Sequence, residues 1–344
     1  MKNLLFAFAA VLVFSAISAT ADEPEPVKIW GGQARHNAFT DIIQFNGKFY
    51  CSFREGMGHI PGKKTGQGDG KARVLVSDDG TNWKPIALLQ KKTYDLRDPK
   101  LSVTPDGRIM VLMGGSLYVD GVLKSRRPFV SFSDPKGQNF TDPLPIRIAP
   151  VAATHMDWLW RVTWHKGAGY GVVYQPSTVQ GKDWNVHLVR TTNGIDYALV
   201  AHLNVKGHPN ESTVRFVPES DTMKILVRRE AQGREAMLGT SEEPYTDWRW
   251  VNTGQSLGGP NFIFLPNGTI LAGGRVNGQT GLGTIDSEGK FNLFRILPST
   301  GDNSYPGFCI SDKTLYITYY STEKENRVSI FLVKYPLDEL MKSL

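Results

Sequence analysis

The chain has 344 residues, a formal net charge of +6, 35 glycines, 8 tryptophans and only 2 cysteines. Abundant glycine with frequent aromatic residues is typical of many short strands joined by tight turns, and two cysteines exclude a disulfide-rich scaffold. The positive charge suits an anionic partner. Because no run of lysine and arginine is present, we expect no nucleic-acid partner.

Residues 1–21 have the pattern of a cleavable signal peptide. Lys2 gives a positive start, residues 4–14 are almost unbroken apolar, and Ala19 and Ala21 occupy the two positions that a signal peptidase reads. The apolar run is shorter than the roughly 20 residues that span a bilayer, so we expect no membrane span. Residues 22–344 are predicted to form one domain, secreted or periplasmic, and we expect a monomer.

Six hairpin turns recur along the mature chain and define six units. Four of these turns have glycine as their third residue, at 45–48, 105–108, 165–168 and 266–269. The other two, at 219–222 and 311–314, match the pattern less well because they lack the glycine. Asn or Asp followed by glycine tolerates the positive φ that tight hairpins need. The spacing of roughly 45–60 residues is typical of propeller blades.

A second motif falls later in most units. It reads Ser-Asp-Asp-Gly-Thr-Asn-Trp at 77–83, with variants at 131–140, 191–197, 241–248 and 284–291. In such a turn the hydroxyl and the carboxylate accept backbone N–H bonds, and the aromatic ring packs between sheets. We therefore expect a structural role for Asp79 and Trp83 and no catalysis.

These repeats resemble those of sialidase-like propellers with Asp-box (BNR) motifs. The resemblance implies an all-β fold, a six-bladed β-propeller, with the substrate site at one end of the central channel. It also implies an exo-α-sialidase (neuraminidase) type of glycosidase that removes a terminal sialic acid or a similar acidic sugar. Only residues 337–341 read as a helix.

The same resemblance implies a catalytic pair. Asn210 and Glu211 start a strand in the fourth unit and Arg228 ends the next, so Glu211 is matched to the general base and Arg228 to a carboxylate-binding arginine. In the sixth unit Tyr305 is matched to the nucleophile, although Pro306 replaces the usual serine. A neutral phenol suits a substrate that carries its own carboxylate, because an anionic nucleophile would be repelled.

The remaining substrate-binding and acid positions are matched less completely. Arg275 in the fifth unit corresponds to a second clamp arginine. In the first unit the family's arginine position falls on Ala38, and Arg54 is a candidate replacement. The general acid is either His59 or Asp69. His59 ranks first because its ordinary pKa lies near neutrality and Asp69 lies in a glycine-rich turn.

Two further polar clusters open the innermost strands of the second and third units. Asp98 and Arg161 are predicted to line the pocket, and Trp158 or Trp160 is a candidate for stacking on a sugar. The alternative is that these residues form salt bridges between blades and aromatic cores within them.

The chain shows no cofactor signature. The two cysteines, Cys51 and Cys309, lie in strand-like runs, and we expect them to be small buried residues rather than a disulfide. No spaced set of His and Cys predicts a metal, so we expect none.

Two other functions stay open. One is a propeller glycosidase or polysaccharide lyase that acts on another uronate-containing glycan through His59 and a tyrosine, which the missing first arginine favours. The other is a non-catalytic glycan-binding propeller, because a fold does not fix a function. In all three cases the expected partner is a glycan.

Overall fold

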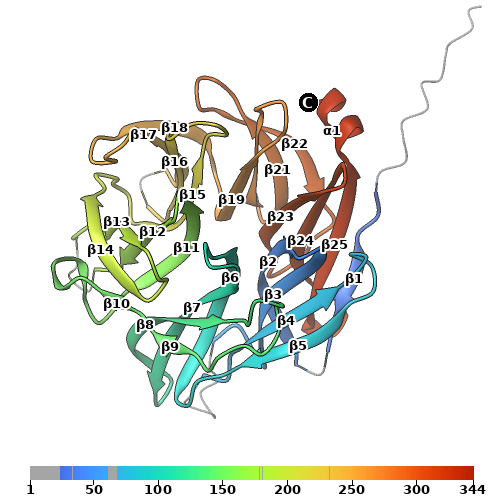
Figure 1. Ribbon diagram of the computed structural model, residues 1–344, viewed down its shortest axis with the longest axis horizontal. Helices are drawn as coiled ribbons and strands as arrows, with labels where there is room; N and C mark the ends of the chain where they lie inside the picture. Colours follow the sequence, from blue (N-terminus) through green and yellow to red (C-terminus); the bar gives the residue numbers. More distant parts are fainter. Residues whose placement is uncertain (1–23, 33, 61–67, 178, 180, 232) are drawn as a thin grey trace, which may run out of the picture.

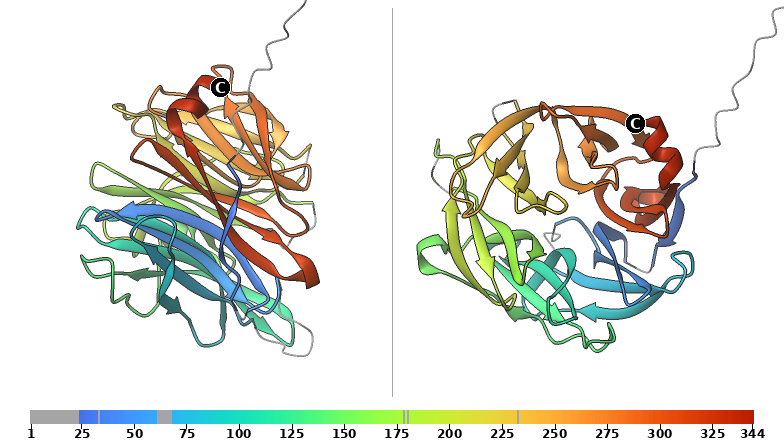
Figure 2. Two further views of the ribbon diagram at one scale, coloured as in Figure 1. Left: turned by 90° about the vertical axis from the view of Figure 1, so that its right-hand side faces the viewer. Right: turned by 45° about the horizontal axis from the view of Figure 1, so that its top comes forward.

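The computed structural model describes residues 24–344 except 33, 61–67, 178, 180 and 232. Within these residues it has twenty-five strands, two 3-10 turns (Pro150–Ala152 and Lys324–Asn326) and one helix, α1 (Leu337–Ser343). The strands form sheets that follow one another around a central axis (Figures 1 and 2). None of its helices is long and apolar enough to cross a membrane. The predicted signal peptide lies outside the described residues.

The strands form antiparallel sets of four, and the sets follow the predicted units. The innermost strands are β2 (His36–Phe45), β6 (Tyr94–Val103), β11 (Trp158–His165), β15 (Pro209–Phe216), β19 (Gly258–Phe264) and β23 (Ser304–Ser311). The second strands are β3 (Lys48–Gly56), β7 (Ile109–Val119), β12 (Ala168–Gln175), β16 (Met223–Arg229), β20 (Ile270–Val276) and β24 (Thr314–Thr322). All six predicted hairpin turns join these first two strands.

The outer half of each set completes the sheet. The third strands are β4 (Lys71–Ser77), β8 (Val122–Phe132), β13 (Asn185–Thr191), β17 (Glu235–Ser241), β21 (Gln279–Ile285) and β25 (Val328–Pro336). The outermost strands are β5 (Lys84–Leu89), β9 (Leu144–Pro145), β14 (Asp196–His202), β18 (Arg249–Ser256), β22 (Phe291–Leu297) and β1 (Val27–Trp30). A short strand, β10 (Arg147–Ile148), pairs in parallel with β14.

The first strand of the described chain closes the ring. β1 pairs with β25, with Val27 opposite Leu332, so the amino-terminal strand completes the carboxy-terminal set (Figure 1). One parallel pair, His36 with Val328, also joins β25 to β2. Hydrogen bonding therefore gives five sheets, one of them eight-stranded, instead of six separate ones. The all-β, propeller-like arrangement agrees with the prediction.

The second sequence motif forms turns between third and fourth strands. Asp79 Oδ1 accepts the backbone N–H groups of Thr81 and Asn82, each at 2.8 Å. Asn193 repeats this with the N–H groups of Ile195 and Asp196. The sixth set has no such turn because β1, which lies at the other end of the chain, supplies its fourth strand. That explains why the sequence shows five copies.

Every innermost strand carries a bulge that the sequence did not predict. In β15, Pro209 pairs with Arg229 and Ser212 with Val227. Two residues of β15, Asn210 and Glu211, therefore lie opposite a single residue of β16, Arg228. The same two-against-one shift occurs in the other innermost strands. The bulge pairs are Phe39 and Thr40, Asp98 and Pro99, Trp160 and Arg161, Asn210 and Glu211, Gly259 and Pro260, and Tyr305 and Pro306. Bulges re-aim side chains and are frequent next to functional sites.

The apolar core lies mainly between neighbouring sheets. Met110 and Leu112 of β7, for example, belong to the same buried cluster as Leu159 and Val173 of the following set. Both cysteines are buried and free.

We predict that two glycines in turns respond differently to alanine. Gly80 (φ 65°) and Gly47 (φ 73°) are both left-handed, but a Cβ at Gly80 would lie 2.7 Å from Cε1 of Tyr316, whereas a Cβ at Gly47 would meet nothing within 4 Å. Gly47→Ala should lower the free energy of unfolding by about 1 kcal/mol. Gly80→Ala should lower it by about 1–2 kcal/mol more, because it adds overpacking. Urea unfolding measures both, and equal losses would contradict the packing described for Gly80.

Candidate active site

The predicted catalytic pair is in direct contact at the axis. Tyr305 Oη donates to Glu211 Oε1 at 2.7 Å, and Arg228 Nη1 donates to Glu211 Oε2 at 2.6 Å. The same guanidinium nitrogen lies 3.1 Å from Tyr305 Oη. The backbone N–H of Gly259 donates to Glu211 Oε2 at 2.9 Å. Three different units thus meet at one carboxylate.

The charges of this pair follow from its surroundings. Burial raises the pKa of Tyr305 well above its usual value, and the Glu211 charge adds to the rise, so the phenol is neutral. Burial also pushes the pKa of Glu211 upward, but Arg228 and the bonds from Tyr305 and Gly259 outweigh it and leave that pKa below its usual value. The site therefore holds a neutral phenol whose proton points at an ionised carboxylate, which is the arrangement of a nucleophile with its base.

A second cluster gathers around Asp302. Its Oδ2 is 2.9 Å from His36 Nε2 and 2.6 Å from His59 Nδ1. Its Oδ1 accepts from Tyr320 Oη at 2.9 Å and from Arg275 Nη2 at 3.1 Å. Burial opposes ionisation, but the two imidazoles outweigh it and hold the pKa of Asp302 far below its usual range. Burial lowers the pKa of His36, which the bond to Asp302 only partly offsets.

The Asp302 cluster has the composition of a metal site but not its hydrogen-bond pattern. One ligand atom each from His36, His59 and Asp302 lie within 4.8 Å of one another. Arg54 Nη1, which can only donate, lies 3.3 Å from His36 Nδ1. That contact places the His36 proton on Nε2, the nitrogen that would have to bind the metal. A metal-bound histidine instead donates from its other nitrogen, so the cluster fits a hydrogen-bonded His–Asp–His group better.

Phe39 and Arg275 join the two clusters into one site, which we call the pocket. The Phe39 ring centre lies 5.1 Å from that of Tyr305 and 5.4 Å from that of His59. The Arg275 guanidinium lies 5.7 Å from the centre of the Tyr305 ring. The His59 side chain is 48% exposed, whereas Tyr305 is 7% exposed. A ligand therefore meets His59 at the rim and Tyr305 deeper in.

Three predicted pocket residues form the floor beneath Tyr305. Trp160 is 1% exposed and packs edge-on against the Tyr305 ring at 5.6 Å, so it supports the tyrosine and has no free face for a sugar. Arg161 is buried in an ion pair with Asp41 at 2.7 Å. Asp98 is buried in its bulge, and burial raises its pKa to about 6. Burial likewise lowers the pKa of the neighbouring Lys100 to about 8.

The other predicted residues bond protein groups next to the pocket. Arg54 is fully buried and bonds both oxygens of Asp95, at 2.9 and 2.7 Å, so it has no exposed surface with which to replace the missing substrate arginine. Asp69 accepts the Met57 N–H at 2.8 Å and anchors the loop that presents His59. Asn210 donates to Glu230 at 3.1 Å. Of the two acid candidates, only His59 is bonded into the Asp302 cluster.

Sequence reasoning missed several residues of the site. Asp302, His36, Phe39, Glu230, Lys100 and Tyr320 were not proposed. Asp302 stands only three positions before Tyr305, and His36 lies in the segment searched for an arginine, so proximity to a matched residue was an available signal. Lys100 gave no signal, because its role follows from burial beside Trp160, at 4.8 Å from the ring centre.

The arginines of the pocket are already paired with carboxylates. Arg228 bonds Glu211 and Glu230, both at 2.6 Å, and Arg275 bonds Asp302 at 3.1 Å. Arg54 and Arg161 pair with Asp95 and Asp41. Such pairing lowers the net positive charge available for the carboxylate of a substrate.

Comparison with known sequences gives no match to a protein-family model and none to a curated protein. Comparison of structures does. A protein of unknown function from Dyadobacter fermentans DSM 18053 superposes with a TM-score of 0.76 at 18% identity, over 90% of this chain and 97% of that one. Trypanosoma rangeli sialidase in complex with the inhibitor DANA gives 0.70 at 12% identity, over 94% and 59%. Penicillium chrysogenum α-L-arabinanase complexed with arabinobiose gives 0.69 at 15% identity, over 92% and 98%.

These similarities concern the fold. The chain is similar to glycosidases with a propeller fold, and it spans about three fifths of the sialidase's length. At such low identities the activity has to be inferred from the site.

We predict a pH-dependent effect of Asp98→Asn. The pKa of Asp98 is raised to about 6 in the folded state, against about 3.9 when unfolded. The folded state therefore holds this proton more tightly, and stability falls as the pH rises from about 4 to about 6. The free energy of unfolding of the wild type, minus that of the variant, should be about 2 kcal/mol larger at pH 4.5 than at pH 7. Urea unfolding at both values measures this, and an unchanged difference would contradict the burial assigned to Asp98.

Proposed function

We propose that the protein is a retaining glycosidase of the sialidase type that removes a terminal acidic sugar, such as a sialic acid, from glycans. The observation that carries the proposal is the 2.7 Å contact between Tyr305 Oη and Glu211 Oε1, with Arg228 bridging both groups. The propeller fold shared with glycosidases supports it. We count the eight-stranded sheet as two blades joined by the single pair His36–Val328, which makes the ring six-bladed.

The first step forms a glycosyl–tyrosine bond. Glu211 takes the phenol proton while Tyr305 Oη attacks the anomeric carbon. The bond from that carbon to the leaving oxygen breaks, and His59 protonates this oxygen. A phenol is a suitable nucleophile here because its neutral form is not repelled by an acidic sugar.

The second step releases the sugar. His59, now neutral, takes a proton from water, and the resulting hydroxide attacks the anomeric carbon. The bond to Tyr305 Oη breaks, and Glu211 returns its proton to the tyrosine. Asp302 binds His59 Nδ1 and leaves Nε2 without a partner among the described residues, so Nε2 is the nitrogen that exchanges protons with the substrate and water.

A uronate lyase is the second candidate, and the absence of an arginine at the family's first arginine position, which falls on Ala38, favours it. Arg275 is bonded to Asp302, and His36 stands near the position where sialidases carry their first arginine. In a lyase His59 would take the proton next to the sugar carboxylate and Tyr305 would protonate the leaving oxygen. The product would be an unsaturated sugar that absorbs ultraviolet light, which separates the two reactions.

The predicted export of the protein also remains a proposal. An exported enzyme would meet glycans outside the cytoplasm, and residues 1–21 would supply the signal.

We predict that Tyr305→Phe lowers kcat by about a thousandfold. The measurement uses a panel of fluorogenic glycosides that contains a sialoside, a hexuronide and an arabinofuranoside. Tyr316→Phe is the control, because Tyr316 lies outside the pocket and packs on Phe49 with ring centres 4.4 Å apart. If Tyr305→Phe keeps full activity on whichever glycoside the wild type cleaves, Tyr305 is not the nucleophile.

We predict that the effect of His59→Gln depends on the leaving group. Glycosides with poor leaving groups should lose about a hundredfold in rate or more, and activated aryl glycosides much less, because they leave without a proton. His165→Gln is the control, since His165 forms a similar pair with Asp221, at 2.6 Å, outside the pocket. An equal loss on both kinds of substrate would argue against His59 as the acid.

A further inference from the structure

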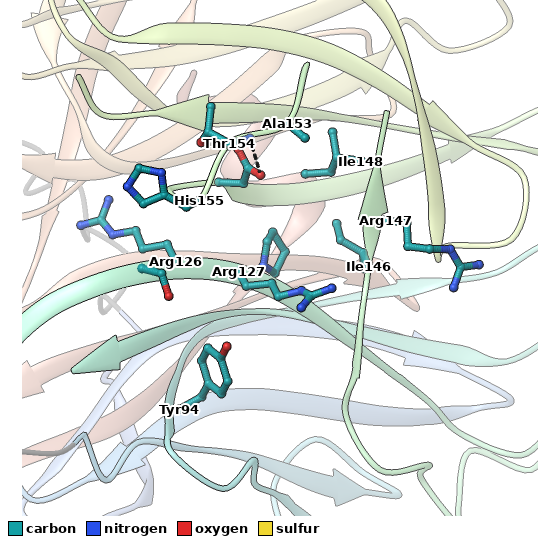
Figure 3. A pocket seen from close by; sticks show the side chains of 12 residues that line it. Tyr94, Arg126, Arg127, Ile146, Arg147, Ile148, Ala153, Thr154 and His155 are labelled. Atoms are coloured by element: carbon teal, nitrogen blue, oxygen red, sulfur yellow. Dashed lines mark hydrogen bonds between the residues drawn. The ribbon is translucent and has the colours of Figure 1, made fainter. Parts of the chain in front are cut away.

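Two adjoining clefts lie beside the catalytic pocket. The first has a volume of about 430 Å³ and lies between the start of β6, the middle of β8, the short strand β10 and the connection leading into β11 (Figure 3). The second, of about 580 Å³, is lined by Lys71, Lys91 and Lys92 and also by two acids, Asp69 and Asp142. Tyr94 lines both. Neither contains Tyr305 or Glu211, so these clefts are separate from the site described above.

The clefts open on the same end of the sheets as the pocket. Tyr94 is the first residue of β6, as His36 is of β2 and Ser304 of β23. Arg126 lies over the ring of Trp158, 5.4 Å from its centre, and Trp158 is the first residue of β11. Two residues further along β11, Trp160 packs on Tyr305. A glycan that leaves the pocket between the second and third sets would therefore enter the first cleft.

Two of the three arginines that line the first cleft, Arg126 and Arg127, are paired with no carboxylate of the described residues. Among the described residues neither Arg126 nor Arg127 forms an ion pair, and the buried Nε of Arg126 has no hydrogen-bond partner. The oxygens of Asp157, which also lines the cleft, already accept bonds from Thr154 and Gln175. Of the three arginines in this cleft, Arg147 alone has an acidic partner in the part of the chain that the structure describes, and that partner is Asp196. The cleft thus differs from the pocket, where the arginines are paired.

Unpaired guanidinium groups in an open cleft favour anionic ligands. Their planar forks bind carboxylate and sulfate groups through two parallel bonds. The half-buried ring of Tyr94 offers an apolar face of the kind that sugars contact. The second cleft, with three lysines against two acids, adds a small net positive charge next to the first. A ligand that reaches both clefts has to be a chain.

We propose that these clefts bind an anionic polysaccharide, bearing carboxylate or sulfate groups, whose end reaches the catalytic pocket. The second part rests on the proposed function, whereas the binding itself does not. The substrate would then be recognised mainly through the acidic groups of its chain rather than through its terminal sugar alone.

The test measures binding to the mature protein by calorimetry. The probes are a hexamer of galacturonate, a heparin hexasaccharide, neutral maltohexaose and an oligodeoxythymidine of equal charge. At least one anionic hexasaccharide should bind and maltohexaose should not, and binding should weaken when the salt rises from about 0.05 to about 0.3 M. Galacturonate and heparin distinguish carboxylate from sulfate recognition.

A double variant locates the binding. Arg126→Gln with Arg127→Gln should weaken binding about tenfold or more, whereas Arg249→Gln with Lys342→Gln, which changes the charge equally at exposed positions that line neither cleft, should leave it within about twofold. Equal weakening by both double variants, equally tight binding of oligodeoxythymidine, or no binding of either anionic hexasaccharide would overturn the proposal. Tyr305→Phe should still bind, so loss of activity without loss of binding concerns the catalytic assignment alone.

Discussion

The bulge in each innermost strand is the constraint on which the site depends. A regular strand would turn alternate side chains toward and away from the sheet, but the extra residue breaks this alternation at the same height in every set. Phe39, Asp98, Gly259 and Tyr305 accept left-handed backbone there, with φ between 49° and 67°. A Cβ at Gly259 would lie 2.4 Å from the Tyr305 ring, so this glycine is what lets the tyrosine approach Glu211. Strained backbone of this kind is kept where the surroundings enforce it.

Charge pairing decides what the pocket can bind. Burying a guanidinium group costs free energy unless a carboxylate is paired with it. The buried arginines near the axis all have such a partner: Arg54, Arg161, Arg228 and Arg275. The pairing fixes the geometry of Glu211 and Asp302, on which the proposed chemistry relies. It also reduces the attraction that the pocket itself exerts on an anion. Arg126 and Arg127, which have no acidic partner among the described residues, lie outside the pocket. The paired arginines of the pocket thus position the catalytic carboxylates, whereas the arginines of the first cleft attract an anionic ligand.

The local features of the fold were predictable from the sequence, and the contacts across the ring were less so. Hairpin glycines, the turn around Asp79 and the carboxy-terminal helix depend on nearby residues. Glu211, Arg228 and Tyr305 were found because each resembles a family motif, and the structure brings all three together. Asp302 and His36 become neighbours only when the last set meets the first, which a single sequence does not reveal. The motif identified Arg54 as a site residue. Its pairing with Asp95, which lies on a strand of the next set and buries the Arg54 side chain, could not be predicted from the motif.

The closure of the ring by β1 has a consequence for how the chain is made. β1 is made long before its partner β25, because all the other described strands lie between them in the sequence. Until β25 has been made, the edge of β1 and the edge of β2 that pair with it stay unsatisfied. The ring, and with it the contact between β23 and β2 that shapes the pocket, is therefore expected to close only once β25 is available.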